Sequence, residues 1–175
     1  MKKRIIAFAA LALTGCAQLA SLTGFSISQS ELQSRLNQQL DGWSQDLGKE
    51  LGVETHIDQL DIKLADQKAR IDVGGEAALS RLFKAVPLAI HLSVEGTPSL
   101  EGKAVYLRNV RLLAAKADLL GYSGSLGPDT SAMGKWLTQY LDNHPVYRIP
   151  DSSPFAHIPL NMTVGDGKLQ FKAAN

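Results

Sequence analysis

The sequence predicts an α+β fold in which a curved antiparallel meander sheet wraps around a long N-terminal helix, with a second helix near the C-terminal third. Three observations support this fold class. A helical hydrophobic period follows residue 28, a two-residue period runs from residue 60 to residue 112, and a second helical period begins at residue 133. The 175 residues, 45% hydrophobic and 20% charged, suffice for one domain with a buried core.

The first helix is expected to begin at Ser28, because Ser28-Gln29-Ser30-Glu31 has the pattern of a capping box. Gly48 or Gly52 is expected to end it. Its apolar residues recur every three or four positions and therefore share one face, which consists of Leu32, Leu36, Leu40, Trp43 and Leu47. We predict one continuous helix of about five turns.

Alternating apolar and polar residues predict the strands of the sheet, at residues 60–64, 69–79, 86–95 and 105–112. This pattern is typical of an antiparallel meander with one dry face. Gly96-Thr97-Pro98 is expected to end the third of these strands. Gly74-Gly75 is expected to form a bulge or bend that helps the sheet to curl.

The last third of the chain begins with residues 121–128, which contain four glycines or prolines and are interpreted as a loop. The second helix follows and stops at Pro145. Its apolar face consists of Met133, Trp136, Leu137, Tyr140 and Leu141. Two short strands joined by a turn at 165–167 are expected to close the chain.

Residues 1–15 are interpreted as a signal peptide. Lys2-Lys3-Arg4 gives a positive start, and the apolar run at 5–13 is too short to span a membrane as a helix. Leu13-Thr14-Gly15-Cys16 resembles the lipobox of bacterial lipoproteins, in which the chain is cut between Gly15 and Cys16 and the thiol receives a diacylglycerol. Cys16, the sole cysteine, is therefore the expected lipidation site. The alternative is an ordinary secretory signal with a chance cysteine.

A lipidated Cys16 predicts a membrane-anchored protein, because two or three acyl chains such as palmitate hold a protein stably on a bilayer. Ala17, rather than aspartate, follows the cysteine. By resemblance to enterobacterial lipoprotein sorting, this favours the inner leaflet of the outer membrane, with the protein facing the periplasm. Residues 16–24 would form a lipidated tether and residues 25–175 a single lipid-binding-like domain.

Charge and cysteine content exclude several classes of function. Without the leader, 15 basic residues stand against 17 acidic ones, and this net charge of −2 gives no electrostatic basis for binding nucleic acid. A single cysteine excludes an internal disulfide, a Cys-rich zinc site and an iron–sulfur cluster. The histidines at 56, 91, 144 and 157 lack the spacing of a helical metal pair, so we expect no metal and no cofactor.

Enzyme activity is not expected. Residues 121–125 nearly match the G-x-S-x-G elbow of hydrolases around Ser123, but the fifth residue is Ser125 instead of glycine. The elbow also needs a helix directly after it, where the sequence continues as a loop to Pro128. A hydrolase that uses Ser123 or a histidine is the less favoured alternative.

The apolar faces of the helices and strands are more informative. A curled sheet closed by a long helix can leave a groove for acyl chains, although close packing is the rule in protein interiors. From the apolar faces alone, a filled core is the more common outcome. A structural or adaptor lipoprotein that acts through an unknown protein partner therefore stands beside a protein that binds a lipid or another hydrophobic ligand in such a groove. The expected groove lining is Leu36, Leu40, Trp43, Ile62, Leu64, Ile71, Val73, Leu88, Ile90, Leu92, Leu137 and Tyr140.

Four stretches of the chain resemble the YceB-like bacterial lipoproteins, a family of unknown function. They match in order and spacing from Phe25 onwards and are Phe25–Leu32, Leu79–Phe83, Tyr140–Tyr147 and Val164–Leu169. Residues 150–159 are richer in proline than the family pattern. The family is similar in fold to the tubular lipid-binding (TULIP) proteins, in which a curved sheet wraps a long helix around an apolar groove. The resemblance implies lipid binding at the outer membrane and supplies no catalytic residues.

Overall fold

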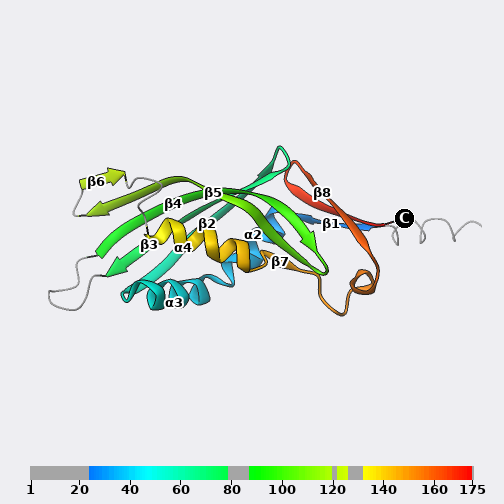
Figure 1. The fold of residues 1–175 in the computed structure, drawn as a ribbon, viewed down its shortest axis with the longest axis horizontal. Helices are drawn as coiled ribbons and strands as arrows, with labels where there is room; N and C mark the ends of the chain where they lie inside the picture. Colours follow the sequence, from blue (N-terminus) through cyan, green and yellow to red (C-terminus); the bar gives the residue numbers. More distant parts are fainter. Residues whose placement is uncertain (1–23, 79–86, 120–121, 126–131, 175) are drawn as a thin grey trace, which may run out of the picture.

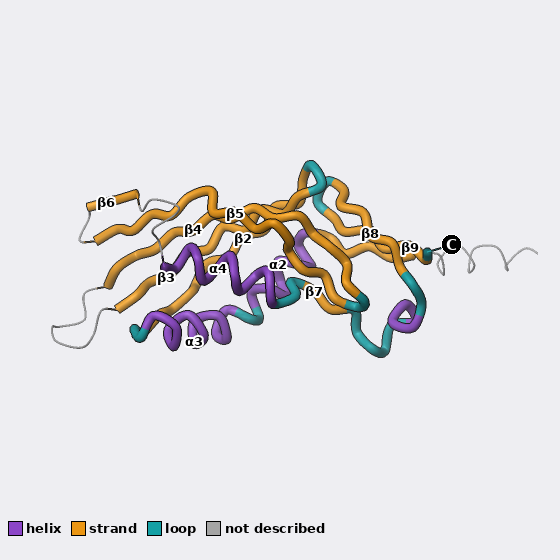
Figure 2. The backbone as a smooth tube through the Cα atoms, viewed as in Figure 1, coloured by secondary structure: helices purple, strands orange, loops and turns teal. Residues whose placement is uncertain are grey.

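A computed structural model of the protein describes residues 24–78, 87–119, 122–125 and 132–174. The larger of its two antiparallel sheets is a meander with the strand order β2-β3-β4-β5-β6, and β7 pairs with the start of β5. The strands are β2 (Glu54–Ala65), β3 (Lys68–Ala78), β4 (Pro87–Glu101), β5 (Ala104–Leu119), β6 (Tyr122–Ser125) and β7 (Tyr147–Arg148). The sheet arches over the helices that cover one of its faces (Figures 1 and 2).

The smaller sheet has the order β1-β9-β8 and forms one end of the molecule (Figure 1). Its strands are β1 (Gly24–Ser28), β8 (Leu160–Gly165) and β9 (Lys168–Ala173). Phe25, Phe171 and Met162 are direct cross-strand partners and therefore share one face. The short 3-10 helix η1 (Pro154–His157) covers this end, where the ring of Phe155 lies 4.9 Å from that of Phe25.

Within the described residues, three α-helices pack against the larger sheet: α2 (Gln29–Asn37), α3 (Leu40–Leu51) and α4 (Ala132–Asn143). The predicted curved antiparallel sheet with helices against it is confirmed. So are the N-cap, where the Glu31 amide donates to Ser28 Oγ at 3.2 Å, and the end at Gly52, which has a φ of 67°.

The expected single N-terminal helix is instead two helices, which meet at Gln38 and Gln39. The Gln39 amide donates to the carbonyl of Leu36 at 2.9 Å, a tightened turn that ends α2. The break lets both helices follow the twisted, bulged edge strand β2. Gln29 and Gln33 reach the part of β2 at residues 60–64, and Ser44 of α3 reaches the part at residues 55–57.

The side chains of these helices satisfy backbone groups along the free edge of β2. Gln29 Oε1 accepts from the Leu64 amide at 3.0 Å, and Gln33 Oε1 accepts from the Ile62 amide at 2.7 Å. Gln33 Nε2 donates to the carbonyl of Leu60. An edge strand covered in this way cannot pair with another chain.

Replacing Gln33 with alanine is expected to lower the free energy of unfolding by about 1–3 kcal/mol, because it leaves two part-buried backbone groups of β2 without partners. Gln45→Ala, on the exposed face of α3, is the matched control and should change stability by less than about 0.5 kcal/mol. Urea denaturation of the two variants measures the difference. Equal stability of both variants would show that the edge contacts contribute nothing.

The predicted end of a strand at Gly96-Thr97-Pro98 is wrong. β4 continues to Glu101 through a register shift between Glu95 and Thr97. Pairing with β3 ends at Gly96, so Pro98 lies where β4 is an edge on that side and tolerates a residue without an amide hydrogen. Within the expected loop at 121–128, residues 122–125 form β6, and the others lie outside the described residues.

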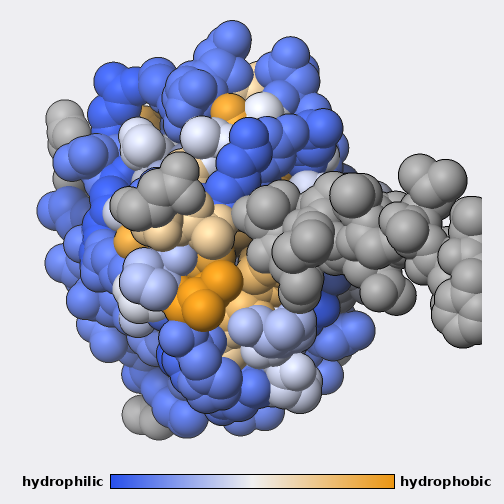
Figure 3. Space-filling model, turned by 90° about the vertical axis from the view of Figure 1, so that its right-hand side faces the viewer, coloured by the Kyte–Doolittle hydropathy of each residue, from blue (hydrophilic) through white to orange (hydrophobic). Residues whose placement is uncertain are grey.

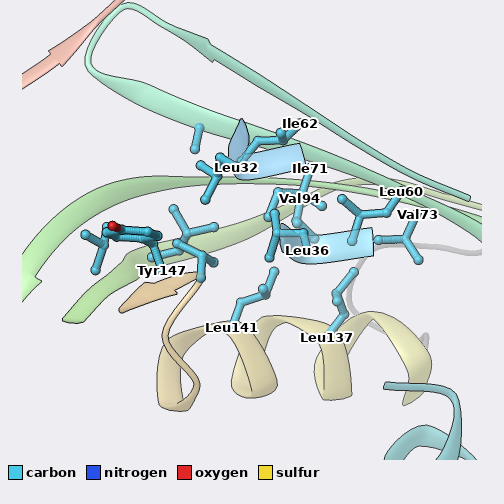
Figure 4. Packing of buried hydrophobic residues seen from close by; sticks show 14 of the residues in the cluster. Leu32, Leu36, Leu60, Ile62, Ile71, Val73, Val94, Leu137, Leu141 and Tyr147 are labelled. Atoms are coloured by element: carbon cyan, nitrogen blue, oxygen red, sulfur yellow. The ribbon is translucent and has the colours of Figure 1, made fainter. Parts of the chain in front are cut away.

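The space between the larger sheet and the helices is packed with side chains. Leu36 of α2 lies between the sheet and α4, whose Leu137 and Leu141 point toward it (Figure 4). Leu36, Ile71 and Leu137 each have 0% of their surface exposed. Density of this kind is normal for protein interiors.

Candidate hydrophobic ligand site

An apolar cleft opens between α3, α4 and strands β2–β4, at the end of the molecule opposite the smaller sheet. Its apolar lining consists of Leu47, Ile57, Val73, Ile90, Leu92, Met133, Trp136 and Leu137. Thr55, His56, Gly74, Gly75 and Glu76 complete the lining. The cleft is narrow, with a volume of about 20 Å³, which is room for roughly one water molecule.

Gly75 lies in the wall of the cleft where β2 and β3 approach each other closely. Gly75 lies opposite Ile57 on one side and Ile90 on the other, and both of these side chains are buried. A Cβ atom at position 75 would lie 2.3 Å from the carbonyl oxygen of His56, so the close approach of β2 requires glycine here. The register shift between Ile57 and Gln59 places a bulge at the same point, in the region where the sequence predicts one.

Helix α4 closes the cleft with two half-buried side chains, Met133 and Trp136. The Trp136 ring stacks on Tyr140 with 4.9 Å between centroids, and Trp43 of α3 meets Tyr140 edge-on at 5.4 Å. Burial, and to a smaller extent the carboxylate of Asp46, raises the pKa of the Tyr140 hydroxyl above its usual range. These rings join α3 to α4 beside the cleft.

The polar groups of the site lie at its rim. His56 and Glu76 are exposed cross-strand partners, and Thr55 Oγ1 donates to the Ser44 carbonyl at 2.6 Å. A shallow depression continues outward from the cleft and includes Glu54, Thr55, His56 and Glu76. The interior of the cleft therefore offers apolar contact, and polar contact is confined to its opening.

Comparison with known proteins gives a family. Residues 27–168 match the model of a family described as "Protein of unknown function (DUF1439)". The chain belongs to the DUF1439 family. The matched residues include the helices α2, α3 and α4 and all of the larger sheet that the structure describes.

The DUF1439 protein matches no curated protein in sequence. A solved structure similar to it is described as "Crystal structure of lipopolysaccharide binding protein", with a TM-score of 0.32 and 13% sequence identity. That match covers 87% of the present chain, which spans only 40% of the length of the other. A likeness of this degree carries no conclusion about a ligand.

The residues expected to line a groove lie in three different environments in the structure. Val73, Ile90, Leu92 and Leu137 line the cleft of this DUF1439 protein. Three others are half-buried and pack against the core, namely Leu40, Leu88 and Tyr140. The remaining five lie within the packed core and are Leu36, Trp43, Ile62, Leu64 and Ile71.

Several cleft residues were not among the expected lining. Leu47, Met133 and Trp136 belong to the apolar faces of the predicted helices, but an apolar face does not show which of its residues border an unfilled space. Ile57 precedes the alternating run at 60–64 and is shifted in phase by the bulge. Gly74-Gly75 was the available signal, since paired glycines inside a strand pattern often mark a bulge or an unfilled position.

The other candidate groups are dispersed. Ser123 lies exposed on β6 opposite Asp118, and His91 is two strands away, opposite Lys116 of β5. His144 stacks on Tyr140 at 3.9 Å at the end of α4. In the described ranges, no three histidine, cysteine, aspartate or glutamate side chains gather to hold a metal ion.

The expected anchor, Gly15 and Cys16, lies outside the described residues. The first described residue, Gly24, is at the outer end of β1, opposite Lys172. Among the helices that the structure describes, none has the length and hydrophobicity to cross a bilayer.

Proposed function

We propose that the protein is a lipoprotein anchored through Cys16 in the inner leaflet of the outer membrane, facing the periplasm, and that it binds a lipid or another hydrophobic ligand in the cleft. The apolar lining beside Gly75, without a buried charge, carries the ligand-binding part of this proposal. The lipobox-like Leu13-Thr14-Gly15-Cys16 supports the anchoring part.

A ligand must widen the cleft as it enters, because the void of about 20 Å³ does not hold an acyl chain. Met133 and Trp136 at its mouth are the side chains to be displaced. Methionine suits this role, since its unbranched side chain adapts to different shapes. Binding then comes from apolar burial at about 25 cal/mol per Å², and little discrimination between headgroups is expected.

The direct test is native mass spectrometry of the non-acylated chain, residues 17–175, which keeps every described residue. A co-purified lipid, released by solvent extraction and identified by its mass, would support the proposal. A chain that carries no lipid and does not bind a fluorescent fatty acid would contradict it.

Filling the cleft is expected to abolish this binding. Ile90→Trp places a larger side chain opposite Gly75, and we expect at least a ten-fold loss of fatty-acid affinity at a stability cost of about 1–3 kcal/mol. Leu100→Trp, at a half-buried position of the same strand outside the cleft, is the matched control and should bind as the parent does. Fluorescence titration measures both variants.

Equal affinity of the Ile90 variant and the parent would show that the ligand does not enter the cleft. Met133→Glu is a second variant for the case in which Ile90→Trp does not fold. It places a charge at the half-buried mouth of the cleft, and the same loss of affinity is expected.

The packed interior favours a second candidate function, a structural or adaptor lipoprotein that acts through a protein partner. Leu36 and Ile71 belong to the groove lining expected from the sequence but have no exposed surface, so that part of the expected groove is filled. For this candidate, we expect no fatty-acid binding that Ile90→Trp could reduce and no lipid that solvent extraction could release. The fatty-acid titration therefore separates the two candidates.

A further inference from the structure

The end of the molecule formed by the smaller sheet and η1 presents apolar side chains to solvent. We call this end the tip and define its apolar part as Phe25, Phe155, Ile158 and Leu160. Ile158 has 40% of its surface exposed, and the other three are half-buried. Figure 3 faces this end and shows apolar surface gathered there within a hydrophilic surround.

Ring contacts and a backbone hydrogen bond connect the elements of the tip. Phe25 stacks on Phe171 at 4.6 Å and meets Phe155 at 4.9 Å. The Ala174 amide donates to the carbonyl of Pro159 at 2.9 Å, which ties the end of β9 to the segment after η1. Ile158, next to Pro159, lies in this connected segment and is 40% exposed.

Basic side chains accompany the apolar part of the tip. Lys103 pairs with Asp151 at 3.1 Å, and Arg148 of β7 lies opposite Ala104, the residue after Lys103. Arg148 and Lys172 are exposed, and neither forms an ion pair with another described residue. Arg108 pairs with Glu101, at the nearby end of β4, at 2.6 Å and with Asp142 at 3.2 Å, so these two carboxylates share one cation. The local balance is therefore positive on a chain whose expected mature form is net negative.

The expected anchor lies near the tip along the chain. Gly24 is eight residues after Cys16, and eight residues span at most about 28 Å. By comparison, the sixteen residues of β5 extend over about 53 Å. Of the parts that the structure describes, the tip is therefore the one held closest to whatever Cys16 is attached to.

We propose that the tip docks on a bilayer surface that carries anionic phospholipid headgroups, with Ile158 entering the interface and Arg148 and Lys172 facing the phosphates. Exposed apolar side chains flanked by basic residues are the combination that binds such a surface. This contact adds to the anchoring at Cys16 proposed above and does not depend on a ligand in the cleft.

The test uses vesicles of phosphatidylethanolamine and phosphatidylglycerol, with phosphatidylcholine vesicles as the neutral comparison, and the non-acylated chain. We expect binding to the anionic vesicles that falls as salt is raised. Ile158→Asp should reduce it at least five-fold. Leu113→Asp is the matched control, because Leu113 is 44% exposed on the distant half of β5, and it should bind as the parent does.

The charge contribution has its own variant. Arg148→Gln and Lys172→Gln together should weaken binding about 25-fold, since each basic group near an anionic surface contributes about five-fold. This double variant also keeps the proposal testable if Ile158→Asp does not fold.

Three outcomes would overturn the proposal: no binding by the parent, no preference for anionic vesicles, or equal losses for the Ile158 and Leu113 variants. The result is separate from the proposed function, because the chain used has no Cys16 to acylate. Ile90→Trp, which fills the cleft, should leave vesicle binding unchanged.

Discussion

Cys16→Ser is expected to abolish incorporation of labelled palmitate into the protein completely. Cys16 is the sole cysteine, and the serine hydroxyl does not replace the thiol that accepts the diacylglycerol. Thr14→Ala is the matched control, because it keeps a small residue before the cut and should leave labelling unchanged. Labelling of growing cells followed by purification of the protein measures the effect.

The location of the protein should change with the anchor. When an ordinary secretory signal delivers residues 17–175, we expect the protein to move from the membrane fraction to the soluble periplasmic fraction. Two or three acyl chains hold a protein far more firmly than one surface contact does. Palmitate retained in Cys16→Ser, or a non-acylated chain that stays with the membrane through salt washing, would contradict the anchoring proposal.

Leu36→Ala is expected to lower the free energy of unfolding by about 2–5 kcal/mol. Leu36 has no exposed surface and fills the space between the sheet and α4, so its removal loses apolar burial and leaves a cavity (Figure 4). Leu113→Ala, at an exposed position, should change stability by less than about 0.5 kcal/mol. Urea denaturation of both variants provides the measurement.

This stability change also decides between a packed and a hollow interior. A leucine that lined an empty groove would lose few contacts on truncation, and its removal would cost well under 2 kcal/mol. A small effect at Leu36 would therefore contradict the packed core and favour an acyl-chain groove that extends beyond the cleft.

The sheet could be predicted because alternation is a local property of the chain. Residues 60–64 and 69–78 show which side chains face inward, and the structure has these side chains facing inward. Whether opposing inward faces meet depends on the helices across from them. Leu36 and Ile71 touch no gap, whereas Val73, two residues along the same face as Ile71, lines the cleft.

The break between α2 and α3 shows a second limit of the sequence. The stripe from Leu32 to Leu47 keeps the helical period across Gln38 and Gln39, so no local signal marks the end of α2. The break is explained by β2, because its bulge and twist determine where Gln33 and Ser44 must lie to reach its backbone. Tertiary contacts of this kind override a local sequence pattern that favours a continuous helix.

The cleft lies near one end of β4 and the tip near the other, and this separation affects how a hydrophobic ligand would be exchanged. Ile90 and Glu101 are eleven residues apart on that strand, a separation of about 36 Å. In a protein docked through its tip, the opening of the cleft would lie far from the surface of the membrane that carries the anchor. The hydrophobic ligand would then be exchanged with a carrier or a second membrane that approaches from the aqueous side. Lipids of the leaflet that holds the anchor would be too far from the cleft to enter it.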